Sequence, residues 1–267
     1  MDNYEIKIIN EKGNKCGSIN KKEADRLVKL KAYEYLCNNE IGYVKKSNKL
    51  SKITIPKYTL SEELLSSISH GIGTLLSIAI LVLCVIFSAI HNDPYAVVSS
   101  AIYGSSSIIL YTMSTLYHSL KVNLAKRVFR IIDHCSIYLL IAGTYTPYAL
   151  VSLRSVSPAT GWTVFGIIWG CAAIGITFTA IDMNKFKVPG LILYLVMGWM
   201  IVISFKTLMS SIDMAGIYLM LGAGIIYTIG AILYGVGKKV KYMHSVFHFF
   251  VVAASVLFFF SIFLYVI

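Results

Sequence analysis

Two histidines near the end of the chain are the first candidates for chemistry. His244 and His248 are four residues apart, so on a helix they share one face with Cβ atoms about 5–6 Å apart, which suits joint coordination of a metal ion. His118 completes a set of three neutral imidazoles with one open position, the pattern of a catalytic zinc site. Ser114 stands one turn before His118, and Asp133 could accept a hydrogen bond from metal-bound water.

Each of these residues also has a simpler explanation. A single pair of histidines four apart often only packs at a membrane interface, and His118 could be a helix-end residue that reaches toward water. Asp133 could form an interfacial ion pair with Arg127 or Arg130. The metal site is favoured because the candidates come from three predicted helices, all within roughly 10 Å of one interface at a rise of about 1.5 Å per residue.

The helices that must position these residues are membrane spans. Of the 267 residues, 57% are hydrophobic and 14% are charged, whereas soluble domains carry about 25% charged residues. A span needs roughly 20 mostly apolar residues. Because runs such as 78–87 are apolar on every face, we predict an all-α seven-helix bundle rather than the alternating strands of a transmembrane barrel. The expected spans are 64–90, 95–118, 131–152, 161–181, 189–207, 213–235 and 244–267.

The basic residues fall mostly on one side of these spans. The formal charge is +11, and 22 of the 24 Lys and Arg residues lie in residues 1–63 or in the second, fourth and sixth connectors. The positive-inside rule therefore places the N-terminus in the cytoplasm and the C-terminus outside. We interpret the charge as a topology signal of a multi-pass plasma-membrane protein, and expect membrane lipids rather than nucleic acids as partners.

A polar N-terminal appendage at 1–57 precedes the membrane domain at 58–267. It is either a small regulatory or docking module or a partly ordered tail. No apolar segment near Met1 resembles a cleavable signal peptide, and five cysteines without a C-x-x-C spacing are expected to be reduced. The expected elements of the appendage are a strand at 4–9, a turn at 12–14, a strand at 16–19, and a helix that Asn20 and Glu23 open and that continues to about Cys37.

Four groups of motifs occur in a fixed order within residues 58–267. They are Glu62-Glu63 with Ser69-His70-Gly71-x-Gly73, then Ser114-x-x-x-His118, then Ile132-Asp133-His134-x-x-Ile-Tyr138 with Gly143-Thr-Tyr-Thr-Pro147, and finally His244-x-x-x-His248. In this combination they closely resemble the hemolysin III proteins, the bacterial branch of the progestin and adiponectin receptor family. The chain departs from the pattern at Ser66, where many relatives have Asn, and the resemblance does not extend to the long appendage.

This resemblance implies a zinc ion held by His118, His244 and His248, with Ser114 and Asp133 around a bound water. It also implies a seven-helix bundle with a cytoplasmic N-terminus. A wider superfamily that includes alkaline ceramidases uses a similar set of residues to hydrolyse lipid amides, which suggests a hydrolase.

Three functions stay open. The first is a zinc-dependent hydrolase of a lipid amide or ester, in which zinc lowers the pKa of its water toward about 7 and Asp133 is the general base. The second is a lipid-sensing regulator with structural zinc. The third is a pore-forming cytolysin, which the family's name implies and which we rank last because the inward basic loops and apolar helices indicate a resident membrane protein.

Two further histidines are not expected to bind metal. For His70 we predict an interhelical hydrogen bond. His134 follows Asp133 directly, so it points about 100° away from it on a helix and is expected to pack elsewhere.

Overall fold

The computed structural model describes residues 5–9, 15–30, 33–36, 40–43, 50, 53–91, 93–236 and 240–267. The chain divides into two compact units, Met1–Lys52 and Ile53–Ile267.

The N-terminal unit is a small mixed sheet with one helix. Strand β1 pairs with β2 in the antiparallel and with β4 in the parallel direction, and the strand order is β2-β1-β4-β3. Ile6, Ala24 and Ile41 form its buried core, so this unit has the packing expected of a module. Its elements are β1 (Glu5–Ile9), β2 (Lys15–Asn20), α1 (Lys21–Lys29), β3 (Tyr33–Leu36) and β4 (Glu40–Tyr43).

The sequence predicted part of this unit. Asn20 begins α1 as expected, because its side chain accepts a hydrogen bond of 2.9 Å from the backbone nitrogen of Glu23. The predicted end near Cys37 is wrong: α1 ends at Lys29, and Tyr33–Leu36 is a strand, where two aromatic residues favour extended structure. The predicted turn at 12–14 lies outside the described residues.

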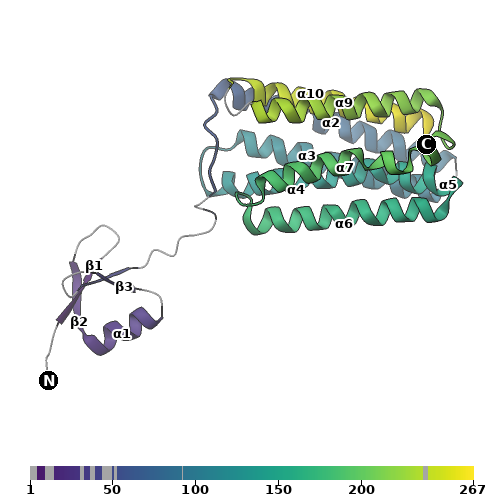
Figure 1. Cartoon of the computed structure of the whole chain (residues 1–267). Helices are drawn as coiled ribbons and strands as arrows, with labels where there is room; N and C mark the ends of the chain where they lie inside the picture. Colours follow the sequence, from purple (N-terminus) through teal and green to yellow (C-terminus); the bar gives the residue numbers. More distant parts are fainter. Residues whose placement is uncertain are drawn as a thin grey trace. The chain divides into compact units, whose positions relative to one another are not determined.

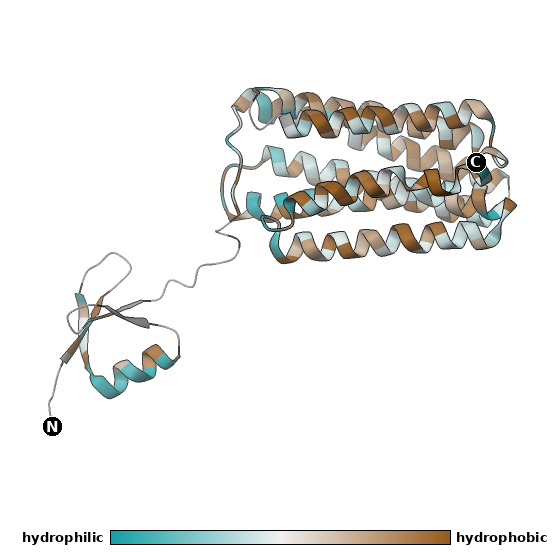
Figure 2. Cartoon of the chain, in the orientation of Figure 1, coloured by the Kyte–Doolittle hydropathy of each residue, from teal (hydrophilic) through white to brown (hydrophobic). Residues whose placement is uncertain are grey.

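The second unit contains seven helical segments long and apolar enough to span a membrane, which confirms the predicted helical fold class. Figure 1 shows the long helices lying side by side, and in Figure 2 hydrophilic residues gather toward their ends. The spans are α2 (Leu60–Ile90), α3 (Pro94–Ser119), α4 (Leu124–Pro147) continued by the π-helical η2 (Tyr148–Leu153) and α5 (Arg154–Val156), α6 (Pro158–Asp182), α7 (Lys187–Trp199) continued by the 3₁₀-helical η3 (Met200–Ser204) and α8 (Phe205–Met209), α9 (Met214–Val236) and α10 (Met243–Tyr265).

Helix α4 begins seven residues before the predicted start of the third span. Asn123 caps it by accepting a hydrogen bond of 2.9 Å from the backbone nitrogen of Lys126. The predicted connector at 121–130 is therefore largely helical, and Lys126 and Arg130 are buried rather than exposed in a loop. Pairing of the lysine with a carboxylate from α2 makes this burial possible.

Helix α7 is interrupted in the middle of its span. After Trp199 the α-helix changes to a 3₁₀-helix, and an α-helix resumes as α8. The hydroxyl of Tyr145 on α4 donates to the carbonyl of Gly198 at 2.9 Å and accepts from the backbone nitrogen of Ile201 at 3.0 Å. A neighbouring helix thus satisfies backbone groups at the break, which hydrocarbon could not do.

Candidate metal centre

Three histidines from two helices converge at one end of the bundle. His118 lies in the last turn of α3, and His244 and His248 lie in the first two turns of α10. The Nε2 atom of His244 is 3.4 Å from Nε2 of His118 and 3.2 Å from Nε2 of His248. Ligands of tetrahedral zinc at about 2.0–2.1 Å from the ion are about 3.3 Å apart. Two of the three nitrogen pairs therefore have the spacing of zinc ligands, and the three residues offer ligand atoms that all lie within 4.8 Å of one another.

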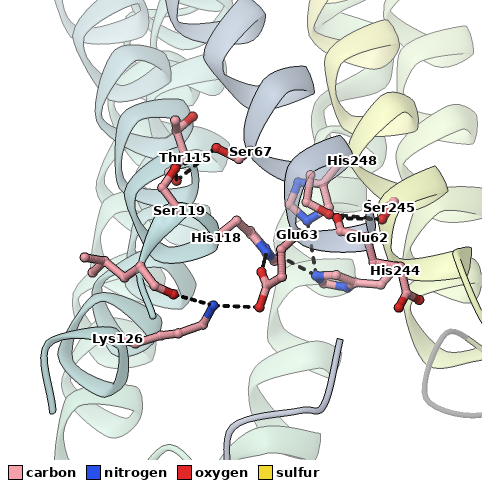
Figure 3. A network of polar contacts seen from close by, with 12 residues as sticks. Glu62, Glu63, Ser67, Thr115, His118, Ser119, Lys126, His244, Ser245 and His248 are labelled. Atoms are coloured by element: carbon pink, nitrogen blue, oxygen red, sulfur yellow. Dashed lines mark hydrogen bonds and ion pairs between the residues drawn. The ribbon is translucent and has the colours of Figure 1, made fainter. Parts of the chain in front are cut away.

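A carboxylate from α2 orients the ring of His118 (Figure 3). The Glu63 Oε2 atom is 2.6 Å from Nδ1 of His118, and its other oxygen accepts a hydrogen bond of 2.6 Å from Nζ of Lys126. Lys126 also donates to the carbonyl of Leu120 at 3.0 Å. A proton on Nδ1 that bonds to Glu63 would leave Nε2 of His118 free to bind a metal ion.

The start of α10 is held against α2 by Glu62, the residue before Glu63 in the sequence. The Oε1 atom of Glu62 accepts a hydrogen bond of 2.8 Å from the backbone nitrogen of Tyr242. Tyr242 has a φ of 66°, a left-handed conformation that costs a non-glycine residue energy. Ser66 on α2 lies 3.2 Å from Ser245 through their hydroxyls. These contacts set the position of α10 and therefore of His244.

Three tyrosine rings pack against His118 and His244. Tyr58 stacks on His244 with ring centroids 4.6 Å apart and an interplanar angle of 7°. Tyr117 meets His118 edge-on at 4.6 Å, and Tyr234 lies 5.7 Å from His244. Burial raises the pKa of Tyr58, so its hydroxyl stays protonated. All three imidazoles are buried.

An apolar cavity of about 200 Å³ adjoins the histidines. Ser114 and Asp133 line it together with His244 and His248. The structure thus brings the proposed catalytic residues to the same cavity as two of the candidate ligands. From there the cavity extends between helices to the aromatic side chains of Tyr145, Trp199 and Phe258.

The expectation for His134 is wrong. It lines the same cavity as Asp133, and its Nδ1 is 3.5 Å from the Asp133 Oδ2 atom. Adjacent side chains diverge on a helix, but these two are long enough to turn toward a cavity that faces both positions. Asp133 and His134 therefore both face the cavity.

His70 also differs from its prediction. Both of its ring nitrogens are buried without a hydrogen-bond partner among the residues the structure describes. Its ring instead packs between Tyr111, with centroids 5.0 Å apart, and His248, with centroids 4.0 Å apart. Aromatic contacts occupy the place of the expected interhelical hydrogen bond.

The sequence did not assign roles to Glu63, Lys126 and Tyr58. Glu63 was visible as an acidic residue before the first apolar run, and Lys126 as one of a group of basic residues. Only the tertiary contact between α2 and α4 reveals that the two form an ion pair. Tyr58 gave no local signal, because its function depends on the ring of His244.

Together the fold and this site define a polytopic membrane protein with a histidine centre at one end of its helix bundle. A sequence model of the family described as Haemolysin-III related matches residues 58–259. The chain belongs to this family. No solved structure matches the protein.

Similar proteins occur in bacteria and in mammals. Hemolysin-3 of Bacillus cereus is 39% identical over 215 residues, which cover 80% of this chain and 96% of that protein. The hemolysin-3 homolog of Bacillus subtilis is 40% identical over 208 residues, which cover 78% and 96%. The human monocyte to macrophage differentiation factor is 27% identical over 183 residues, which cover 66% and 74%. The residues that match the family model, 58–259, all lie in the membrane unit.

Proposed function

We propose that this protein binds one zinc ion through His118, His244 and His248 and hydrolyses an amide or ester bond of a membrane lipid. The observation that carries the proposal is the position of Nε2 of His244, which lies 3.4 Å from Nε2 of His118 and 3.2 Å from Nε2 of His248. Zinc in such a site supplies Lewis-acid chemistry and lowers the pKa of water toward about 7.

The chain's own residues have distinct roles in this proposal. Asp133 accepts the proton of the attacking water on a carboxylate oxygen, and His134 holds that carboxylate from 3.5 Å. Ser114 lies on the same cavity wall and positions the water. The apolar part of the lipid lies in the cavity, whose mostly hydrophobic lining suits an acyl chain.

Metal content tests the first half of the proposal. Purified protein should contain close to one zinc per chain, and the double variant His244→Ala/His248→Ala should lose most of it. The variant should also unfold at a lower temperature, because an ion that binds only the folded state stabilises it. If the double variant retained all of its zinc, His244 and His248 would not be zinc ligands and the proposed site would be wrong.

Asp133→Asn tests the second half. We expect it to fold and to retain zinc, but to lose about 10²–10⁴-fold in rate, the usual effect of losing a general base. The assay is turnover of amide and ester lipids in membrane-like particles, together with complementation of a deletion strain. If Asp133→Asn complements as well as wild type, the hydrolase proposal is abandoned.

A structural role of zinc is the second candidate. It is favoured by the origin of the ligands, which come from the end of α3 and the start of α10 and would tie these helices together. In that case Asp133→Asn leaves the cellular lipid phenotype intact, whereas His118→Ala destabilises the bundle.

A further inference from the structure

His70 on α2 is a buried side chain that the proposed chemistry does not use. It is 3% exposed, and both of its ring nitrogens are buried without a hydrogen-bond partner among the residues that the structure describes. No other described histidine has both ring nitrogens in this state. A neutral imidazole carries one N–H donor and one acceptor nitrogen, and buried polar groups normally have partners. The ring therefore has hydrogen-bonding capacity that the described part of the protein does not use.

Aromatic contacts hold the ring of His70 in place. Its centroid lies 5.0 Å from that of Tyr111, at an interplanar angle of 89°, and 4.0 Å from that of His248. Tyr111 is itself fixed, because its hydroxyl donates to Ser255 at 2.7 Å. Gly73 leaves room for the tyrosine ring, since a Cβ atom there would lie 2.6 Å from Cδ1 of Tyr111. These contacts orient the imidazole without using its nitrogens, and a donor oriented in advance is what stabilisation of a developing charge requires.

His70 lies on the wall of the apolar cavity, together with Ser114, Asp133 and His248. His248 is also one of the three candidate zinc ligands, and its ring is in contact with that of His70. A lipid whose reacting bond lies at the metal centre therefore also meets the imidazole of His70. Ligand pockets typically combine a mostly apolar lining with a few polar groups that fix the orientation of the ligand.

We propose that His70 is a further catalytic residue, which donates a hydrogen bond from its ring N–H to the carbonyl oxygen of the amide or ester bond that is hydrolysed. A carbonyl oxygen can only accept hydrogen bonds, and so can the ionised carboxylate of Asp133. The substrate oxygen therefore needs a donor, and His70 has an unpaired one beside the metal centre. The inference rests on the proposed lipid hydrolysis and adds the group that binds the carbonyl.

His70 keeps its proton throughout the reaction. When water attacks the carbonyl carbon, a C–O bond forms, the π-electron pair moves onto the carbonyl oxygen, and the water proton passes to Asp133. The electron pair then re-forms the C=O bond, the bond to the leaving nitrogen or oxygen breaks, and the leaving group takes the proton from Asp133. Hydrogen bonds to a charged oxygen are about twice as strong as those to a neutral one. The bond from His70 therefore strengthens as the oxygen becomes negative, which lowers the barrier.

The test compares His70→Phe with the matched control Ser77→Ala in zwitterionic lipid nanodiscs. Phenylalanine keeps a ring between Tyr111 and His248 but removes both nitrogens. Ser77 is also buried on α2, but its hydroxyl already donates to the carbonyl of Gly73 at 2.8 Å, and it does not line the cavity. Both variants should contain as much zinc as wild type. Loss of zinc in His70→Phe alone would make His70 a metal ligand and overturn the proposal.

The probe is methyl nonyl ketone with a carbon-13 label in its carbonyl, because it presents a carbonyl oxygen but has no bond that water can hydrolyse. In wild type and in Ser77→Ala, infrared spectroscopy should show a carbonyl band at lower frequency than that of the ketone in empty nanodiscs, since a hydrogen bond weakens the C=O bond. The shifted band should be absent in His70→Phe, and the Kd of the ketone should rise about 2–10-fold. Undecane, which lacks the carbonyl, should bind wild type and His70→Phe equally.

A shifted band of equal strength in wild type and His70→Phe overturns the proposal, as does a wild type without any shifted band. Should His70→Phe not fold, the smaller His70→Leu takes its place with the same expectations. Failure of both variants to fold would show that His70 is structural and overturn the proposal.

Lipid turnover separates this inference from the proposed function. His70→Phe should lower kcat about 10²–10³-fold, with a smaller change in KM, because the hydrogen bond is strongest in the transition state. Hydrolysis with the same kcat in wild type and His70→Phe would keep the enzyme and remove this inference. A shifted band that depends on His70 in a protein that hydrolyses no lipid would keep the carbonyl-binding role of His70 and remove the enzyme.

Discussion

At the scale of single residues, the ring of His118 presents Nε2 to the other histidines because Glu63 binds its Nδ1 atom. The same carboxylate neutralises Lys126. One side chain therefore orients a candidate ligand and pairs a buried cation, so we expect metal binding to depend on a residue outside the candidate ligand set.

Glu63→Gln tests this dependence. The amide keeps the shape of the side chain but loses its charge, so His118 becomes a weaker ligand. Loss of such a partner typically lowers metal affinity about 10–100-fold. Zinc affinity is measured by competition with a chelator, and the control is Asp93→Asn, which changes a helix-capping carboxylate at the start of α3. Equal affinity in Glu63→Gln and wild type would show that Glu63 does not support the ligand.

The candidate ligands could be predicted because the spacing of His244 and His248 is a local property of one helix. The role of Glu63 could not, since it depends on a contact between residues 55 positions apart. The same limit explains His134, whose orientation depends on the cavity that α4 shares with other helices. Sequence patterns identified chemical groups, but not the contacts that orient them.

At the scale of helices, close packing of α2 on α3 depends on a small residue. A Cβ atom at Gly104 would lie 2.6 Å from Cβ and 2.7 Å from Cα of Leu81, and the backbone cannot move away cheaply. Small residues allow membrane helices to approach in this way. The contact holds together the helices that carry Glu63 and His118.

Gly104→Ala should therefore destabilise the bundle by about 1–3 kcal/mol, the usual cost of overpacking. The matched control is Gly166→Ala on α6, where an added Cβ meets nothing within 4 Å. The stability of both variants is measured by unfolding them in increasing concentrations of sodium dodecyl sulfate. Equal stability of the two variants would show that α2 and α3 can separate without loss.

Apolar length was enough to predict the seven spans, because the requirement for about 20 residues is imposed by the bilayer. The break in α7 could not be predicted, since Met200–Ser204 contains neither proline nor glycine. The backbone groups freed there are bonded by the hydroxyl of Tyr145, a residue 53 and 56 positions away from its two partners. The burial of Lys126 in the first turn of α4 likewise depends on its pairing with another helix.

At the scale of the whole molecule, the distribution of basic residues predicts which side of the membrane the metal centre faces. Basic residues concentrate in residues 1–63 and in the connectors at the end of the bundle that carries the histidines. The centre should therefore face the cytoplasm.

Reporter fusions test this topology. A reporter after Ile267 should be found outside the cytoplasm, and one inserted between Asp182 and Pro189 should be found inside. Exchange of Lys238, Lys239 and Lys241 for Gln should weaken the preference for this orientation in the membrane, because cationic connectors resist translocation. Detection of both reporters on one side would contradict the three spans predicted between them and so overturn the count of seven.

The central claim is that His118, His244 and His248 bind one zinc ion, and zinc K-edge X-ray absorption of the purified full-length protein tests it most directly. We expect three imidazole nitrogens at about 2.0–2.1 Å, one oxygen at a similar distance, and no sulfur ligand. The imidazole signal should disappear in His244→Ala/His248→Ala. A zinc ion with sulfur ligands, or an unchanged spectrum in the double variant, would contradict the claim.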